Sequence, residues 1–193
     1  GLDRDDAIRR MREALNAFVI RGISSNIPFQ AALLAHPKFV AGDFNTGFIA
    51  EHYAHGFRAE DVPHDDPNFL VALAAAAYRR YLERASGISG QLAGHQVVIG
   101  DEFVVVVKGQ QGEHAHVPVS IEVERATVVH VAGRSYAVDS HWQFGGIRAS
   151  GSCNGRLFTA QVERHGLWLR VEHNGLRIDA QVMTARAAEL LRR

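Results

Sequence analysis

Asp139, Ser140 and His141 follow one another directly and have the residue types of a hydrolytic triad. In such a triad, the fold brings the acid, the histidine and the nucleophilic hydroxyl together. Neighbouring residues at a strand end point to opposite faces of the sheet, so these three side chains cannot form the relay. The pattern therefore favours an ordinary strand end over a hydrolytic site.

Two pairs of histidines and one cysteine are the other candidates for chemistry. His114 and His116 share a face of a predicted strand, and His52 and His55 lie on a short predicted helix. A full set of four ligands is not apparent around either pair, so we do not predict a metal site. Cys153 lies in an alternating segment with nothing nearby to lower its pKa, which indicates a structural thiol.

An all-round apolar helix is the strongest structural signal in the chain. Residues 69–78 carry no polar group except one tyrosine hydroxyl, so every face of this helix must be covered. Asp65 and Asp66 can cap its start, Pro67 suits its first turn, and Gly87 ends it. Arginines and a glutamate appear only near its end, so that end should reach solvent or a partner.

The chain from Gln96 to Met183 changes to strict alternation of apolar and polar residues, which is typical of strands. Asn154-Gly155 and Asn174-Gly175 are typical of tight hairpins, so an antiparallel meander is expected. About eight strands close into a barrel whose lumen must be filled, and the apolar helix is the natural filling. The expected strands are 96–99 (or only an arm), 102–108, 117–124, 127–131, 135–139, 147–153, 156–164, 167–173 and 176–183.

The first 55 residues predict three helical pieces. One begins at Asp3 or Asp5 and has an amphipathic face that includes Met11 and Phe18. A second follows Asn26, and Thr46 can cap a short third. These pieces form no obvious closed core, so they are predicted to be the edge of a larger domain, with residues 55–64 as a linker.

Composition limits the possible partners. The 193 residues include 21 basic and 21 acidic residues and no basic run, so neither a nucleic-acid surface nor a polybasic membrane patch is predicted. No apolar stretch reaches the roughly 18 residues of a membrane span, and no signal peptide opens the chain. We therefore expect a soluble protein of a reducing compartment, without membrane or nucleic-acid partners.

Several sequence blocks carry a family resemblance. RGISSNIP (21–28), LAHPKF (34–39) and GDFNTGFI (42–49) resemble the carboxyl end of the biotin carboxylase domain of biotin-dependent acyl-CoA carboxylases. VDSHW (138–142), the Asn-Gly hairpins and MTARAAEL (183–190) are similar to the linking region of propionyl-CoA carboxylase α subunits. Together the two resemblances cover nearly the whole chain.

The resemblance implies an α+β chain with three parts. Residues 1–60 would be the carboxyl-terminal fragment of a biotin carboxylase domain. Residues 61–183 would be a BT domain, an antiparallel barrel of about eight strands wrapped around a central apolar helix. Residues 184–193 would lead toward a biotin carrier domain.

The implied function is assembly, because in this family the BT domain docks the α subunit onto the carboxyltransferase β subunit. The complete enzyme would use biotin, ATP, magnesium and bicarbonate to carboxylate propionyl-CoA, in a hetero-oligomer that is a dodecamer by family resemblance. Neither Lys38 nor Lys108 is flanked by methionine, so biotin is not expected here, and no catalytic, cofactor or metal residue carries over. The expected location is the cytoplasm in bacteria or the mitochondrial matrix in eukaryotes.

The connector 86–100 is the predicted partner contact. Its glycines follow a helix end, whereas phosphate loops precede a helix, and its apolar residues have no local core. In the family, a hook-like segment at this place contacts the β subunit; a plain surface loop is the alternative. Aromatic side chains are favoured interface anchors; the first tryptophan below has a position at the barrel rim as its alternative, and the second should face outward. The predicted contact residues are Ile88, Gln91, Leu92, His95, Trp142 and Trp168.

Two other functions remain open on the sequence. A free-standing barrel could bind a small hydrophobic ligand, although the predicted central helix would occupy its cavity. The same pattern also fits the oligomerisation module of a pyruvate carboxylase-like enzyme.

Overall fold

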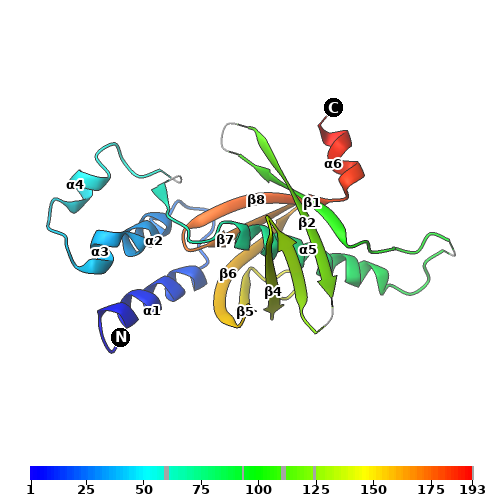
Figure 1. Ribbon diagram of the computed structural model, residues 1–193, viewed down its shortest axis with the longest axis horizontal. Coiled ribbons are helices and arrows are strands. Elements are labelled where there is room, and N and C mark those ends of the chain that lie inside the picture. Colours follow the sequence, from blue (N-terminus) through cyan, green and yellow to red (C-terminus); the bar gives the residue numbers. More distant parts are fainter. Residues whose placement is uncertain (59–60, 93, 110–111, 124, 193) are drawn as a thin grey trace.

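A computed structural model describes residues 1–193 with the exception of 59–60, 93, 110–111, 124 and 193. It confirms the predicted fold class, a helical N-terminal part followed by a closed barrel of eight antiparallel strands (Figure 1). Parts of four predictions lie outside the described residues: 59–60 of the linker, 93 of the connector, 124 of the strand 117–124, and 193 of the last segment.

The barrel is a meander in which each strand pairs with the next, and β1 pairs with β8 to close the sheet. The turn residues Asn154 and Asn174 have φ of 50° and 49°, as Asn-Gly hairpins require. Residues 96–99 form no strand, because a closed sheet leaves no free edge for a ninth. The strands are β1 (Glu102–Lys108), β2 (His114–Val123), β3 (Thr127–Val131), β4 (Arg134–Ser140), β5 (Arg148–Cys153), β6 (Arg156–His165), β7 (Trp168–His173) and β8 (Leu176–Met183).

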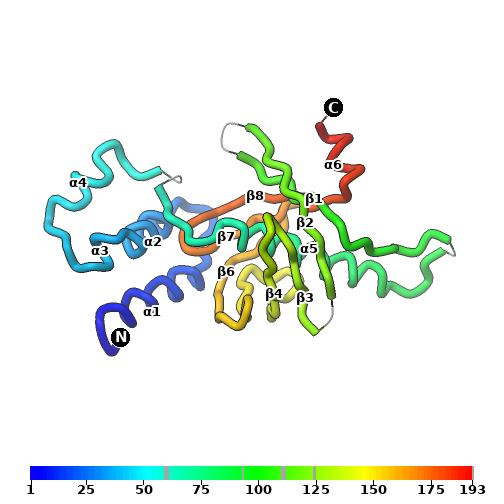
Figure 2. Tube along the Cα trace, in the orientation of Figure 1, coloured from blue at the N-terminus to red at the C-terminus, as the bar shows by residue number. Residues whose placement is uncertain are grey.

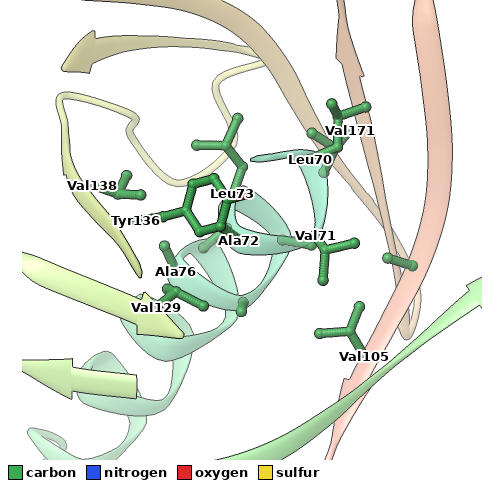
Figure 3. Packing of buried hydrophobic residues seen from close by; sticks show 14 of the residues in the cluster. Leu70, Val71, Ala72, Leu73, Ala76, Val105, Val129, Tyr136, Val138 and Val171 are labelled. Atoms are coloured by element: carbon green, nitrogen blue, oxygen red, sulfur yellow. The ribbon is translucent and has the colours of Figure 1, made fainter. Parts of the chain in front are cut away.

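The helix α5 (Asn68–Ser86) buries nine consecutive residues, from Phe69 to Ala77. It packs against β1, β2, β3, β4, β6, β7 and β8. Its buried residues share one apolar cluster with strand residues such as Val105, Val129 and Val171 (Figure 3). Each large side chain that is fully buried in such a cluster contributes about 1.5 to 3 kcal/mol, so this contact is a major source of stability.

The start of α5 differs from the prediction. Its N-cap is Pro67, and no side chain caps the helix, so the predicted cap by Asp65 or Asp66 is wrong. The Asp66 carboxylate instead accepts a hydrogen bond from the Tyr136 hydroxyl, with Oη 2.8 and 2.9 Å from its two oxygens. Arg134 lies 3.5 Å from the same carboxylate. The folded barrel therefore supplies partners that the local sequence does not show.

The N-terminal part holds one more helix than predicted. Its helices are α1 (Arg4–Ala17), α2 (Ile27–Ala35), α3 (Pro37–Ala41) and α4 (Phe48–His52). Asp3 caps α1 as predicted, since its side chain accepts a backbone amide at 2.8 Å. Thr46 does not cap α4, whose N-cap is Gly47 without a side-chain bond. Met11 and Phe18 remain exposed, so the apolar face of this part is only partly covered.

The helical part meets the barrel through buried amide side chains. Gln161 on β6 donates from Nε2 to the carbonyl oxygens of Asn16 (3.2 Å) and Phe18 (2.8 Å) at the end of α1. The Asn16 side chain in turn bonds both the amide (2.7 Å) and the side-chain oxygen (2.8 Å) of Asn174. These contacts place α1 to α4 at one end of the long axis, opposite the far end of α5 (Figure 2).

The last segment also packs on the barrel. Thr184 caps α6 (Ala185–Leu191), and Ala188 lies in a small apolar cluster with Val106 of β1 and Met183 of β8. The described part of the segment 184–193, predicted as a linker, is therefore a helix attached to the barrel wall.

Candidate functional site

The residues that suggested chemistry are not organised for it. The Ser140 hydroxyl oxygen accepts a hydrogen bond from the Trp142 amide at 3.2 Å, and His141 is exposed. Burial raises the pKa of the Cys153 thiol to about 11, so it is protonated at neutral pH. Across the described residues, no three His, Cys, Asp or Glu side chains gather into a possible metal site.

The connector 86–100, which we call the arm, projects beyond the barrel at the end of α5 (Figure 1). Ile88 is 62% exposed and Leu92 is 71% exposed, and Val98 is also open to solvent. His95 is exposed too, and its backbone amide donates to the carbonyl of Leu92 at 2.9 Å. The described arm residues thus present apolar side chains that the chain itself does not cover.

Gln91 holds the arm in its bend. Its Nε2 atom contacts the carbonyl oxygens of Ala85 (3.0 Å), Ser86 (2.9 Å) and Ile88 (3.0 Å). Its Oε1 atom accepts the amide of Val97 at 2.8 Å. One half-buried side chain therefore joins the end of α5 to both sides of the arm. Sequence reasoning named Gln91 as a contact residue, whereas its hydrogen bonds give it a positioning role.

Trp142 forms part of the barrel rim where α5 emerges. It is 3% exposed, and its Nε1 donates to the carbonyl of Gly146 at 2.7 Å. Its ring lies 5.6 Å from Tyr81 and 5.5 Å from Phe144 between centroids. Of the two positions left open for Trp142, the burial favours the rim, because a covered ring offers little surface to a partner.

Trp168 at the start of β7 is half-buried, with its ring 5.9 Å from that of His114. It alternates with Leu169, which is buried in the core, so the indole lies on the outer side of the barrel, as predicted. The structure records no contact that joins Trp168 to the described arm residues. It is a separate surface feature.

Sequence reasoning missed a group of arginines around the end of α5. Arg80 and Arg84 lie on the helix, and Arg164 comes from β6. The only signal was the concentration of charge in residues 79–84, which predicted an end in contact with solvent or a partner. Arg164 could not be found this way, because it lies on a strand far along the chain from the helix.

Comparison with protein families gives two matches. Residues 70–193 match the family described as propionyl-coenzyme A carboxylase BT domain, and residues 1–51 match the biotin carboxylase C-terminal domain. Among the described residues, no helix is long and apolar enough to cross a membrane.

Curated relatives agree with these matches. A propionyl-CoA carboxylase alpha chain from Ruegeria pomeroyi is 36% identical over 98% of this chain and 27% of its own length. The mitochondrial alpha chain of Mus musculus is 27% identical over 98% of this chain and 26% of its own length. Biotin carboxylase 1 of Bacillus subtilis is 50% identical over 29% of this chain and 12% of its own length. The chain thus spans about a quarter of the length of these two alpha chains.

Proposed function

The chain belongs to the propionyl-coenzyme A carboxylase BT domain family, and we propose that it docks the alpha chain of a biotin-dependent carboxylase onto a carboxyltransferase β subunit. The arm is the observation that carries this proposal. Its exposed Ile88 and Leu92 are large apolar groups on a bend that Gln91 holds in place. A partner that covers them gains buried apolar area and loses little entropy in ordering the arm.

The chemistry would lie outside this segment. We infer that the complete enzyme uses biotin, ATP and magnesium, and that this segment binds none of them and contributes no catalytic group. In the proposed assembly, a hetero-oligomer that family resemblance makes a dodecamer, the segment connects the biotin carboxylase side to the carboxyltransferase side. Its proposed location is the cytoplasm in a bacterium or the mitochondrial matrix in a eukaryote. The proposed division of the chain is 1–60, 61–183 and 184–193.

A double substitution in the arm tests the docking role. Ile88→Asp with Leu92→Asp, made in the full alpha chain, should leave the barrel folded and weaken association with the β subunit by roughly a thousandfold, because two apolar anchors are lost and two charges must be desolvated. Association is measured by analytical ultracentrifugation, and folding by circular dichroism on the same samples.

Two exposed leucines elsewhere provide the matched control. Leu157 near the start of β6 is 91% exposed, and Leu167 in the turn after β6 is 71% exposed. Leu157→Asp with Leu167→Asp should leave association unchanged. A loss below tenfold in the arm variant, or an equal loss in the control, would contradict docking through the arm.

The alternative of a small-ligand barrel receives less support. The residues from Phe69 to Ala77 of α5 lie in the same apolar cluster as the inward strand residues, where a ligand would have to bind. No observation favours the pyruvate carboxylase-like module over the family that the chain matches.

A further inference from the structure

Three arginines surround the end of α5, and each stacks on an aromatic ring. The guanidinium carbon of Arg84 lies 5.0 Å from the ring centroid of Phe144. That of Arg164 lies 4.4 Å from the centroid of Tyr81. Arg80 lies 5.7 Å from the centroid of Phe144 on the same side of the rim. We call Arg80, Arg84 and Arg164 the arginine collar.

The collar is not neutralised by the described part of the chain. The carboxylates of Glu83 and Asp101, at the two ends of the arm, both pair with Arg79, at 3.2 and 3.3 Å. Among the described residues, no carboxylate lies within salt-bridge distance of a collar guanidinium. Three positive charges therefore meet at one rim of a chain whose formal net charge is zero.

The collar arginines differ in how much of their hydrogen-bonding capacity is used. Arg80 is half-buried and donates to two backbone carbonyls of the rim. Arg164 donates from Nε to the carbonyl of Gly166 at 2.8 Å, which leaves its two terminal nitrogens available. Arg84 is exposed and makes no side-chain hydrogen bond with the described residues. Arg84 and Arg164 are the members that can accept a new partner.

Stacking by the face prepares a guanidinium for binding by its edge. The ring restricts the long side chain, so less conformational entropy is lost when the arginine binds. The edge N–H groups stay free, and their spacing matches the two oxygens of a carboxylate. The chemistry that such a site recognises best is an acidic side chain.

We propose that Arg84 and Arg164 bind an acidic segment of the carboxyltransferase partner, beside the arm. This inference rests on the proposed function and names a second part of the same interface. The arm starts within one helical turn of Arg84, so a partner that covers Ile88 also reaches the collar. The arm supplies apolar contact, while the collar supplies complementary charge, which speeds association and sets the orientation of the partner.

The experiment measures the affinity of the full alpha chain for its carboxyltransferase partner at low and high salt. Arg84→Glu should weaken binding at least tenfold at about 50 mM NaCl and much less at about 500 mM, because salt screens exposed charges. Arg84→Lys should fall between the wild type and Arg84→Glu, since lysine keeps the charge but loses the paired N–H edge. Arg164→Glu should behave as Arg84→Glu does.

Arg156→Glu is the matched control, because Arg156 is exposed on the turn that opens β6, near the start of α5. It should leave binding unchanged. Melting temperatures of all variants are measured in parallel, since a purely structural role of the stacked arginines would lower stability. A loss of affinity at an unchanged melting temperature supports the proposal.

The outcomes separate this inference from the proposed function. If the wild-type chain binds and Arg84→Glu binds equally well, the collar is not part of the interface, while docking through the arm stands. The collar proposal also fails if Arg156→Glu shows the same loss, or if the loss follows a fall in melting temperature. If the wild-type chain does not bind the partner at all, both proposals fail.

Discussion

The Nε2 atom of His64 lies 2.9 Å from the Nδ1 atom of His173, which joins the segment before α5 to the end of β7. His64 Nδ1 accepts the amide of Asp66 at 3.1 Å, so the proton of His64 is on Nε2 and is donated to His173. Both rings are therefore neutral. Burial, followed by the effects of His64 and Arg12, lowers the pKa of His173 to about 3.

This pair predicts a loss of stability in acid. A histidine with a lowered pKa in the folded state stabilises the fold above its unfolded pKa of about 6.5, and that stability is lost as pH falls from 6.5 toward 3. Burial also lowers the pKa of His64, although Asp65 and Asp66 oppose the shift. The slope contributed by His173 is at most about 1.4 kcal/mol per pH unit.

Thermal melts between about pH 7.5 and 5 check this prediction. His173→Gln should reduce the pH dependence, because the glutamine oxygen can still accept from His64 without taking up a proton. The control is His141→Gln, at an exposed histidine, which should keep the wild-type slope. An unchanged slope in His173→Gln would contradict the assignment.

The second prediction concerns the packing of α5. Ala75 is fully buried, so Ala75→Leu should lower the free energy of unfolding by about 1 to 3 kcal/mol through overpacking. Ala187→Leu, on the exposed face of α6, should change it by less than about 0.5 kcal/mol. Denaturant unfolding of both variants gives the comparison, and equal stability of the two would show that α5 is not tightly enclosed.

The third prediction is that Gln91 orders the arm. Gln91→Ala removes the contacts that hold Ala85, Ile88 and Val97 together, so the amide of Val97 should exchange with deuterium faster. Partner affinity should fall by roughly tenfold, because the arm must then be ordered on binding. Gln96→Ala, at an exposed glutamine of the same arm, should do neither. Unchanged exchange at Val97 would remove the positioning role of Gln91.

The fourth prediction concerns the join between α1 and the barrel. Gln161→Leu leaves the carbonyls of Asn16 and Phe18 without their donor, which destabilises this contact by about 1 to 3 kcal/mol. Deuterium exchange should increase in α1 while the barrel strands keep their protection. Gln181→Leu on β8 is the control, since Gln181 is a half-buried glutamine on another strand. Protection of α1 in Gln161→Leu would show that apolar contacts alone hold the join.

The fifth prediction is that Cys153 reacts slowly. With a pKa of about 11, roughly one thiol in a thousand is ionised at pH 8, against about one in four for an ordinary cysteine. Alkylation by iodoacetamide should therefore be about a hundredfold slower or more in the folded chain, and normal in urea. Complete modification of the folded chain within minutes would contradict a buried, protonated thiol.

The sequence alone was enough to predict the elements that local rules control. The apolar run 69–78 and the alternation after Gln96 give the two periods of a buried helix and of strands that are wet on one face. Asn154 and Asn174 begin turns of the predicted kind, and Asp3 caps α1. These features depend on residues within a few positions of one another, so a single sequence contains the information.

The tertiary structure alone decided which side chains meet. Gln161 stands at a position where alternation predicts a solvent-facing side chain, yet it is buried because α1 lies over it. His64 meets His173, and Arg164 stacks on Tyr81, across many intervening residues. Periodicity says which face of a strand a residue occupies, but not what covers that face. That is set by the closure of the barrel and by the path of the chain over its outside, which bring together positions that no local pattern connects.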